Sequence, residues 1–153
     1  MNIRGGNNIT VFWEKSNPNP GSVSAAHFDE GGNGAAYYKQ KWRGGTHPVG
    51  QDGLMSRKRL GLREGGEWVN YTFEAAKPGK YTLTLSRTDY RREWPMRAMI
   101  LLDGVYVGDL TAEGQAPQAV LNGIEISAGT HRLTVISACA YGVWASDLDF
   151  KLE

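Results

Sequence analysis

The sequence predicts an all-β domain, a sandwich of two antiparallel sheets. From Glu67 onward, apolar and polar residues alternate with a period of two, the pattern of a strand with one buried and one solvated face. Glycine-containing turns separate these segments, and no window of comparable length has helical spacing. Short strands joined by turns form either a sandwich or a barrel, and we favour the sandwich.

Length and composition restrict the class of protein. A chain of 153 residues suits one domain with a core of its own. A net charge of +1 argues against a nucleic-acid partner, because phosphate neutralisation needs a concentrated positive charge. The single cysteine, Cys139, excludes an intrachain disulfide. No apolar stretch approaches the ~20 residues of a membrane span, and the polar start has no signal-peptide pattern.

The first 22 residues differ from the rest of the chain. Pro18 and Pro20 lie in an Asn-Pro-Asn-Pro-Gly run that can continue neither a helix nor a central strand. We therefore predict an approach segment over residues 1–22 and one compact domain over residues 23–153. Residues 11–13, Val-Phe-Trp, could still join a sheet as an edge strand.

Three segments carry the alternation most clearly, at residues 67–73, 81–86 and 147–152. Pro78-Gly79 separates the first two of them. Asp103-Gly104 lies between two further apolar segments, and this dipeptide is a strong signal for a two-residue hairpin turn. The tryptophan at the start of the first segment, Trp68, is interpreted as structural because that strand alternates so regularly.

Five segments, in this order, resemble carbohydrate-binding modules of families six and thirty-five. They are the Pro-Gly to Ala-Tyr-Tyr stretch at 20–38, Glu-Trp-Val-Asn-Tyr with the following Pro-Gly-Lys-Tyr at 67–83, Leu-Asp-Gly-Val-Tyr-Val-Gly at 102–108, Ala-Gly-Thr-His at 128–131 and Asp-Leu-Asp-Phe at 147–150. The resemblance implies a jelly-roll β-sandwich that binds polysaccharide or oligosaccharide without catalysis. It also implies a secreted, monomeric module that is tethered to a glycoside hydrolase or polysaccharide lyase.

Members of these families usually hold a structural calcium with two glutamates near the start and an aspartate near the end. Here Ser24 and Ala26 occupy the glutamate positions, and Asp149 remains. Calcium prefers six to eight oxygen ligands, several of them carboxylates. We therefore expect calcium to be absent or weakly held, and no cofactor to be required.

The sugar site that the resemblance implies lies at the loop end and uses two aromatic residues. Neither family aromatic has a clear counterpart in the matching segments, which read Trp-Arg-Gly-Gly-Thr-His at 42–47 and Glu-Gly-Gln-Ala-Pro-Gln at 113–118. A rebuilt site would draw on other residues, some of which could equally pack on the core or lie in a solvated loop: Trp42, His47, Tyr90, Arg92, Trp94, Trp144 and Asp147. A second site, on the concave sheet face, occurs in some relatives and stays open here.

Catalysis is not expected. A glycosidase needs two carboxylates across a cleft. Glu67 falls in a structural match, while Asp89 and Glu93 lie among arginines that would keep them ionised. No nucleophile–base motif is present. The alternatives to a glycan-binding module are a structural spacer that has lost its site and a weak glycan-degrading enzyme.

Overall fold

The computed structural model describes residues 10–14, 21–25, 28–30, 34–38, 60–62, 65–88, 95–139 and 142–153. All regular elements in these ranges are strands, which confirms the all-β prediction. The described residues contain no helix that is long and apolar enough to cross a membrane. The strands are β1 (Val11–Trp13), β2 (Ser22–Ser24), β3 (Tyr37–Tyr38), β4 (Leu60–Leu62), β5 (Trp68–Ala75), β6 (Gly79–Arg87), β7 (Met96–Leu102), β8 (Val105–Ala112), β9 (Gln118–Ile126), β10 (Gly129–Ser137) and β11 (Val143–Leu152).

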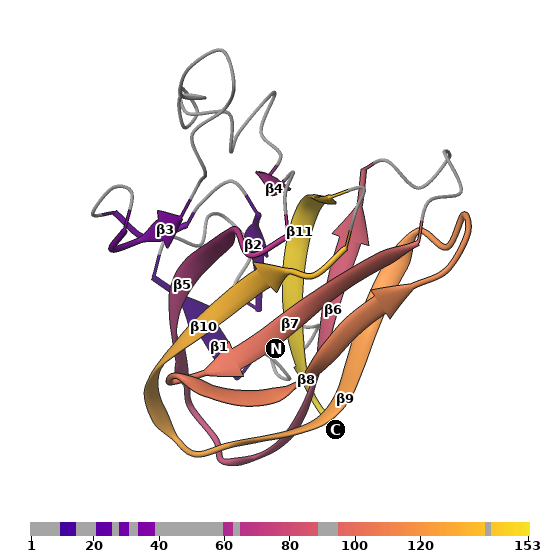
Figure 1. Cartoon of the computed structure of the whole chain (residues 1–153). Helices are drawn as coiled ribbons and strands as arrows, with labels where there is room; N and C mark the ends of the chain where they lie inside the picture. Colours follow the sequence, from indigo (N-terminus) through magenta and orange to yellow (C-terminus); the bar gives the residue numbers. More distant parts are fainter. Residues whose placement is uncertain are drawn as a thin grey trace.

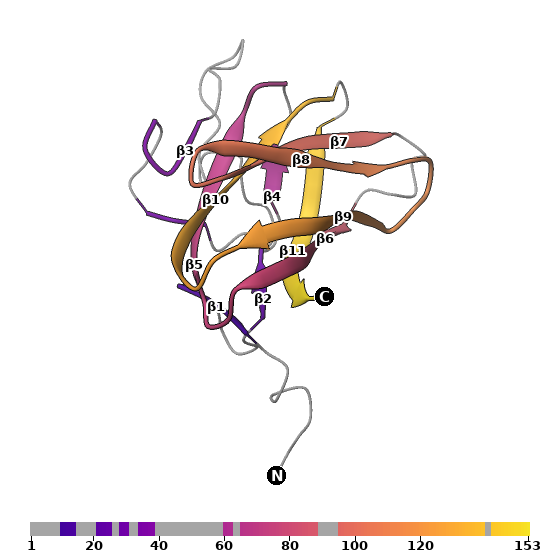
Figure 2. The same ribbon diagram turned by 90° about the horizontal axis from the view of Figure 1, so that it is seen from below.

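The strands form two layers, which confirms the predicted sandwich (Figures 1 and 2). The first layer has the order β1-β5-β10-β7-β8, and the second has the order β9-β6-β11-β2. Every strand pair is antiparallel. The hydrogen-bonding order is continuous, because β8 and β9 join the layers at one residue pair, Thr111 and Val120. Short strands extend the layers, with β3 beside β5 and β4 beside β11.

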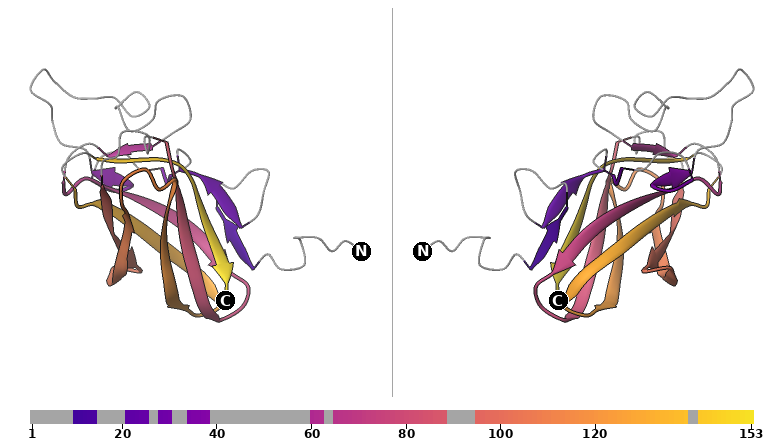
Figure 3. Two further views of the ribbon diagram at one scale, coloured as in Figure 1. Left: turned by 90° about the vertical axis from the view of Figure 1, so that its right-hand side faces the viewer. Right: turned by 90° about the vertical axis from the view of Figure 1, so that its left-hand side faces the viewer.

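The strand β1 is an integral part of the sandwich. It runs antiparallel to β5, with Val11 opposite Ala75 and Trp13 opposite Phe73. Val11 and Trp13 are buried, whereas Phe12 between them is 45% exposed. Figure 3 shows β1 and β2 side by side at one margin of the sandwich.

A cluster of aromatic rings holds the two layers together. Phe150 from the second layer lies at its centre and stacks on Trp13 with ring centroids 5.4 Å apart. Phe150 also contacts Phe73 of the first layer at 4.8 Å and Tyr81 of its own layer at 6.1 Å. Aromatic pairs of this kind contribute roughly 0.5–1.5 kcal/mol each beyond the area that they bury.

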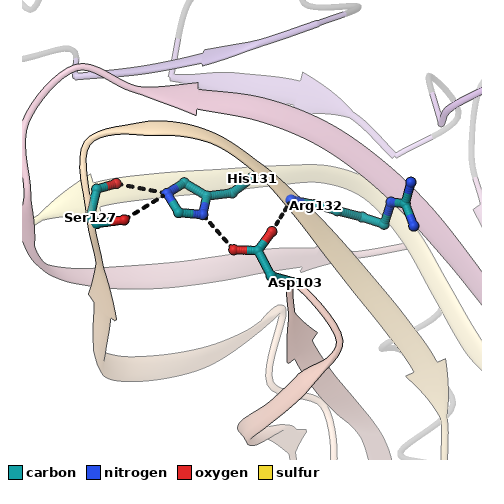
Figure 4. A network of polar contacts seen from close by, with 4 residues as sticks. All are labelled: Asp103, Ser127, His131 and Arg132. Carbon is teal, nitrogen blue, oxygen red and sulfur yellow. Dashed lines mark hydrogen bonds and ion pairs between the residues drawn. The ribbon is translucent and has the colours of Figure 1, made fainter.

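The β7–β8 and β9–β10 turns are joined by a histidine (Figure 4). His131 Nδ1 donates to Asp103 Oδ2 at 2.6 Å, and His131 Nε2 donates to the carbonyl of Ser127 at 2.7 Å. The other carboxylate oxygen of Asp103 accepts the backbone N–H of Arg132 at 2.8 Å. Asp103 has a φ of 52° in the predicted Asp103-Gly104 turn, which suits a residue that tolerates the left-handed region. We call this group the turn clamp.

Both ring nitrogens of His131 face oxygen acceptors, which favours the imidazolium form. Burial lowers the pKa of His131, but the hydrogen bonds to Asp103 and Ser127 outweigh it, so the pKa lies above its ordinary value. Desolvation raises the pKa of Asp103, but the hydrogen bonds from His131 and Arg132 outweigh it and lower that pKa. The clamp is therefore an ion pair at mildly acidic pH.

The turn clamp makes stability depend on pH. His131, whose pKa is raised on folding, stabilises fully below its unfolded pKa of about 6.5 and loses this contribution as pH rises through the folded pKa. Asp103, whose pKa is lowered, stabilises fully above its unfolded pKa of about 3.9. We expect His131→Gln to reduce the free energy of unfolding by about 1–3 kcal/mol at pH 5.5 and by less at pH 8.5.

Urea unfolding of both proteins at the two pH values measures this difference. Asp103→Asn is the matched variant, because asparagine also accepts a positive φ and changes the charge without disturbing the turn. A stability loss that stays the same at pH 5.5 and pH 8.5 would contradict an ion pair.

Candidate functional site

A groove runs over the outer face of the first layer. Its volume is about 580 Å³, and it is formed by β5, β10, β7 and the Asp103-Gly104 turn. The period-two alternation explains its composition, because the β5 residues between those of the core point outward. Its lining residues are Trp68, Asn70, Thr72, Leu101, Asp103, Gly104, Thr130, His131, Arg132, Thr134 and Ile136.

Strand register arranges these side chains in rows across the groove. Ile136 lies opposite Trp68, and Thr134 lies opposite Asn70. Arg132 follows on β10, opposite Thr72 of β5. Strands rise ~3.3 Å per residue, so the four residues from the tryptophan row to the arginine row span ~13 Å. The groove is thus apolar at one end and polar and charged at the other.

The middle of the groove has a polar floor whose groups are already bonded to one another. Thr134 Oγ1 donates to Asn70 Oδ1 at 2.5 Å, and Asn70 Nδ2 donates to the carbonyl of Ala35 at 3.2 Å. Both side chains are nearly buried, with exposed fractions of 8% for Thr134 and 6% for Asn70. The floor is therefore rigid.

Asp29 fixes one wall of the groove. Its Oδ1 accepts the backbone N–H of Thr72 at 2.9 Å, and its Oδ2 accepts the Thr72 hydroxyl at 2.7 Å. The backbone N–H of Asp29 donates to the carbonyl of Asn70 at 2.9 Å. Asp29 thus satisfies the edge of β5 in the interval between β1 and β3. Sequence reasoning did not identify this role.

Trp68 lies on the outer face of β5, outside the core, and the structural role that its sequence suggests stays a prediction. The alternation of β5 is confirmed, but Trp68 lies on the solvent face with Asn70 and Thr72, half-buried in the groove lining. Its cross-strand partner on β3 is Tyr38, which is 41% exposed. Directly opposed residues of an antiparallel pair point to the same face, so Tyr38 projects from the same face of the sheet as Trp68.

A third aromatic residue lies on the same outer face of the first layer, on β8 at the far end of the strand order from β5. Tyr106 of β8 is 54% exposed and lies opposite Leu101, because a bulge in β8 shifts the register by one residue. Its hydroxyl donates to Asp109 Oδ1 at 2.9 Å, and Asp109 Oδ2 pairs with Arg97 Nε at 3.0 Å. These bonds hold the Tyr106 ring in a fixed orientation.

The loop-end site predicted from the sequence falls largely on undescribed positions. Five of its residues lie outside the described ranges: Trp42, His47, Tyr90, Arg92 and Trp94. The other two, Trp144 and Asp147, belong to β11 in the second layer and do not line the groove. The predicted contacts of these residues with sugar stay predictions.

Trp144 lies in a strand rather than in the expected loop, because β11 already begins at Val143. It faces Gly61 of β4 in the register, and its ring lies so close that a methyl group at position 61 would overlap it. The indole therefore packs flat on the backbone of β4. This contact favours the structural role that the sequence left open.

The residues available for calcium lie along β2 and β11. Asp147 is opposite Ser24, which occupies one of the two expected glutamate positions, and Asp149 is opposite Ser22. Within the described ranges, no group of three or more acidic, histidine or cysteine side chains could hold a metal. Burial raises the pKa of Asp149, only partly offset by Lys151. The donor set does not fit a strong calcium site, and Ala26 is undescribed.

Comparison with known proteins identifies the fold. No protein-family model and no curated protein matches the sequence. One similar solved structure is a CBM36 carbohydrate-binding module in complex with calcium and xylotriose, which is 16% identical, with a TM-score of 0.55 over 85% of this chain and 98% of that chain. A second is CsCBM6-3 from Clostridium stercorarium in complex with cellobiose, which is 11% identical, with a TM-score of 0.57 over 86% of this chain and 93% of that chain. A third is the Podospora anserina GH26-CBM35 β-(1,4)-mannanase, which is 12% identical, with a TM-score of 0.53 over 86% of this chain and 27% of that chain. At such identities the likeness is one of fold, and it confirms the expected jelly-roll sandwich.

The packing of Trp144 leads to a stability prediction. Trp144→Ala removes the indole from β4 and should lower the free energy of unfolding by about 2 kcal/mol, in the range for loss of a largely packed apolar side chain. Gly61→Ala, which pushes a methyl group into the same ring, should also destabilise. Thermal unfolding measures both. A Trp144→Ala protein of normal stability that no longer binds sugar would instead support the loop-end prediction.

The donor set leads to a calcium prediction. Because too few carboxylates of the described residues face one point, saturating calcium should raise the melting temperature by less than about 1 °C, below the roughly 2–4 °C that about 1 kcal/mol of stabilisation produces in a domain of this size. Differential scanning calorimetry with calcium and with EDTA tests this. A large rise that EDTA reverses would show that residues outside the described ranges complete a site.

Proposed function

We propose that this chain is a non-catalytic carbohydrate-binding module and that the groove on the first layer is its sugar site. The observation that carries the proposal is the half-buried Trp68 beside a rigid polar floor, on a sheet face that is open to solvent. The shared fold of three carbohydrate-binding proteins supports it. A second site on a sheet face, there the concave one, is an alternative that the sequence leaves open.

The two halves of the groove suit the two faces of a sugar. The C–H face of a pyranose ring is an apolar patch that stacks on an aromatic face, and Trp68 in the groove lining offers such a surface. Sugar hydroxyls need donors and acceptors at fixed positions. The Thr134 hydroxyl oxygen can accept a further hydrogen bond, and Asn70 Nδ2 has a second hydrogen to donate. A preformed floor reduces the entropy cost of binding.

The described lining of the groove does not contain the acid pair that glycoside hydrolysis needs. Asp103 is the single carboxylate among the lining residues that the structure describes, and both of its oxygens already accept hydrogen bonds. Its lowered pKa is the wrong bias for a general acid. These features support binding rather than catalysis.

We further propose that the module belongs to an extracellular carbohydrate-active enzyme. This chain matches 27% of the length of the GH26-CBM35 mannanase, in which a binding module and a mannanase share one chain. A tethered module raises the concentration of its enzyme at the polymer without new contacts to the enzyme itself. The module would act as a monomer, and calcium would be dispensable for its groove.

Affinity electrophoresis on soluble xylan, mannan, mixed-linkage glucan and uronate polymers tests the site. We expect retention by at least one polymer with a dissociation constant between about 1 mM and 1 µM. Trp68→Ala should weaken that binding at least about tenfold, because the stacking surface is lost. Val120→Ala, which removes an exposed apolar side chain from the second layer, should leave it unchanged.

Trp68→Leu is the second variant, because it keeps apolar bulk if the alanine protein fails to fold. Retention of Trp68→Ala equal to that of the unmodified chain would place the site elsewhere. Absence of retention on every polymer would favour the structural spacer.

A further inference from the structure

The polar end of the groove contains an arginine whose side chain forms no hydrogen bond or ion pair within the described part of the protein. From it we infer that the groove selects glycans bearing an anionic substituent, a carboxylate or a sulfate ester, and that the guanidinium of Arg132 binds this group. The inference rests on the proposed sugar-binding function and specifies its ligand class. It uses only residues of the first layer, and not the loop-end positions.

The Arg132 side chain is available for a ligand. Arg132 is exposed on the outer face of β10, and its backbone N–H is the only part of it that bonds to Asp103. Figure 4 shows the guanidinium pointing away from the Asp103 carboxylate. Among the described residues, the guanidinium makes neither an ion pair nor a hydrogen bond. Its planar set of donors matches a carboxylate or a sulfate in two-point geometry.

The acids near Arg132 form no ion pair with its side chain, although the positive charge of Arg132 contributes to the lowered pKa of Asp103. Both oxygens of Asp103 are already taken, one by the His131 ring and one by the Arg132 backbone N–H. At mildly acidic pH, where the turn clamp is an ion pair, the positive charge of His131 offsets the negative charge of Asp103. Glu74 lies opposite Thr130, one row beyond Arg132 on the same face, and forms no ion pair with it.

Register also sets the length of the ligand. The row that contains Arg132 and Thr72 is four residues along β5 from Trp68, about 13 Å away. One sugar ring cannot stack on Trp68 and place its own charged group on the guanidinium over that distance. The ligand must therefore be an oligomer in which the charged unit and the stacked unit are different residues.

Polymers that differ only in their charged group separate the effect of that group on binding from the effect of the sugar backbone. A uronate-containing polysaccharide is compared with its carboxyl-reduced form, and a sulfated polysaccharide with its desulfated form, by affinity electrophoresis and calorimetry at low ionic strength. We expect the charged form of at least one pair to bind about tenfold more tightly than its neutral form, with the preference falling as salt rises. The pair that shows the preference identifies the anion.

Variants assign the effect to one residue. Arg132→Gln should remove the preference for the charged form and leave the affinity for the neutral form within about twofold, because stacking on Trp68 persists. Glu74→Gln should strengthen binding of the charged form by removing a nearby negative charge. Arg97→Gln is the matched control, since it removes the same charge from the same layer where Asp109 already pairs with it.

The outcomes separate the two proposals. Equal binding of charged and neutral forms, or an Arg132→Gln protein that keeps the preference, overturns the inference while neutral-polymer binding upholds the proposed function. An equal loss in the Arg97→Gln protein also overturns it, because general charge would then explain the preference. Failure to retain any polymer, charged or neutral, overturns the proposed function itself.

Discussion

The antiparallel register between β5 and β10 is the constraint on which both the core and the groove depend. It pairs Tyr71 with Leu133 toward the interior and Asn70 with Thr134 toward solvent. Because side chains alternate with a period of two, a slip of one residue would exchange these sets and place a polar network in the aromatic core. The same hydrogen bonds that build the sheet thus fix the rows of the groove.

Other parts of the fold hold this register in place. Phe150 packs against Phe73 from the opposite layer and helps to bury the inner face of β5. Asp29 caps the outer edge of β5, while the bond between His131 and Asp103 closes the turn end of β7 and β10. The groove is therefore supported on its inner face, its edge and one end, so a ligand meets a surface that needs little ordering.

Local patterns predicted the fold well because strand alternation and turn chemistry are short-range properties. The Asp103-Gly104 hairpin and the β5 strand are examples. Alternation also showed that Val69 and Trp68 face opposite sides of the strand. It could not show that Trp68 lies opposite Ile136, because the two residues are 68 positions apart and only the sheet register brings them together. Trp144 was misplaced in a loop because Gly142 precedes it, and its support from Gly61 is likewise long-range.

The location of the sugar site is the central claim, and an NMR titration of the labelled chain with a retained oligosaccharide tests it most directly. Sugar bound in the groove should shift the backbone amide signals of residues 68–72 and 130–136, together with the indole N–H of Trp68. Shifts confined to residues 39–59 and 89–94, or to β11, with the amides of β5 and β10 unmoved, would contradict the account.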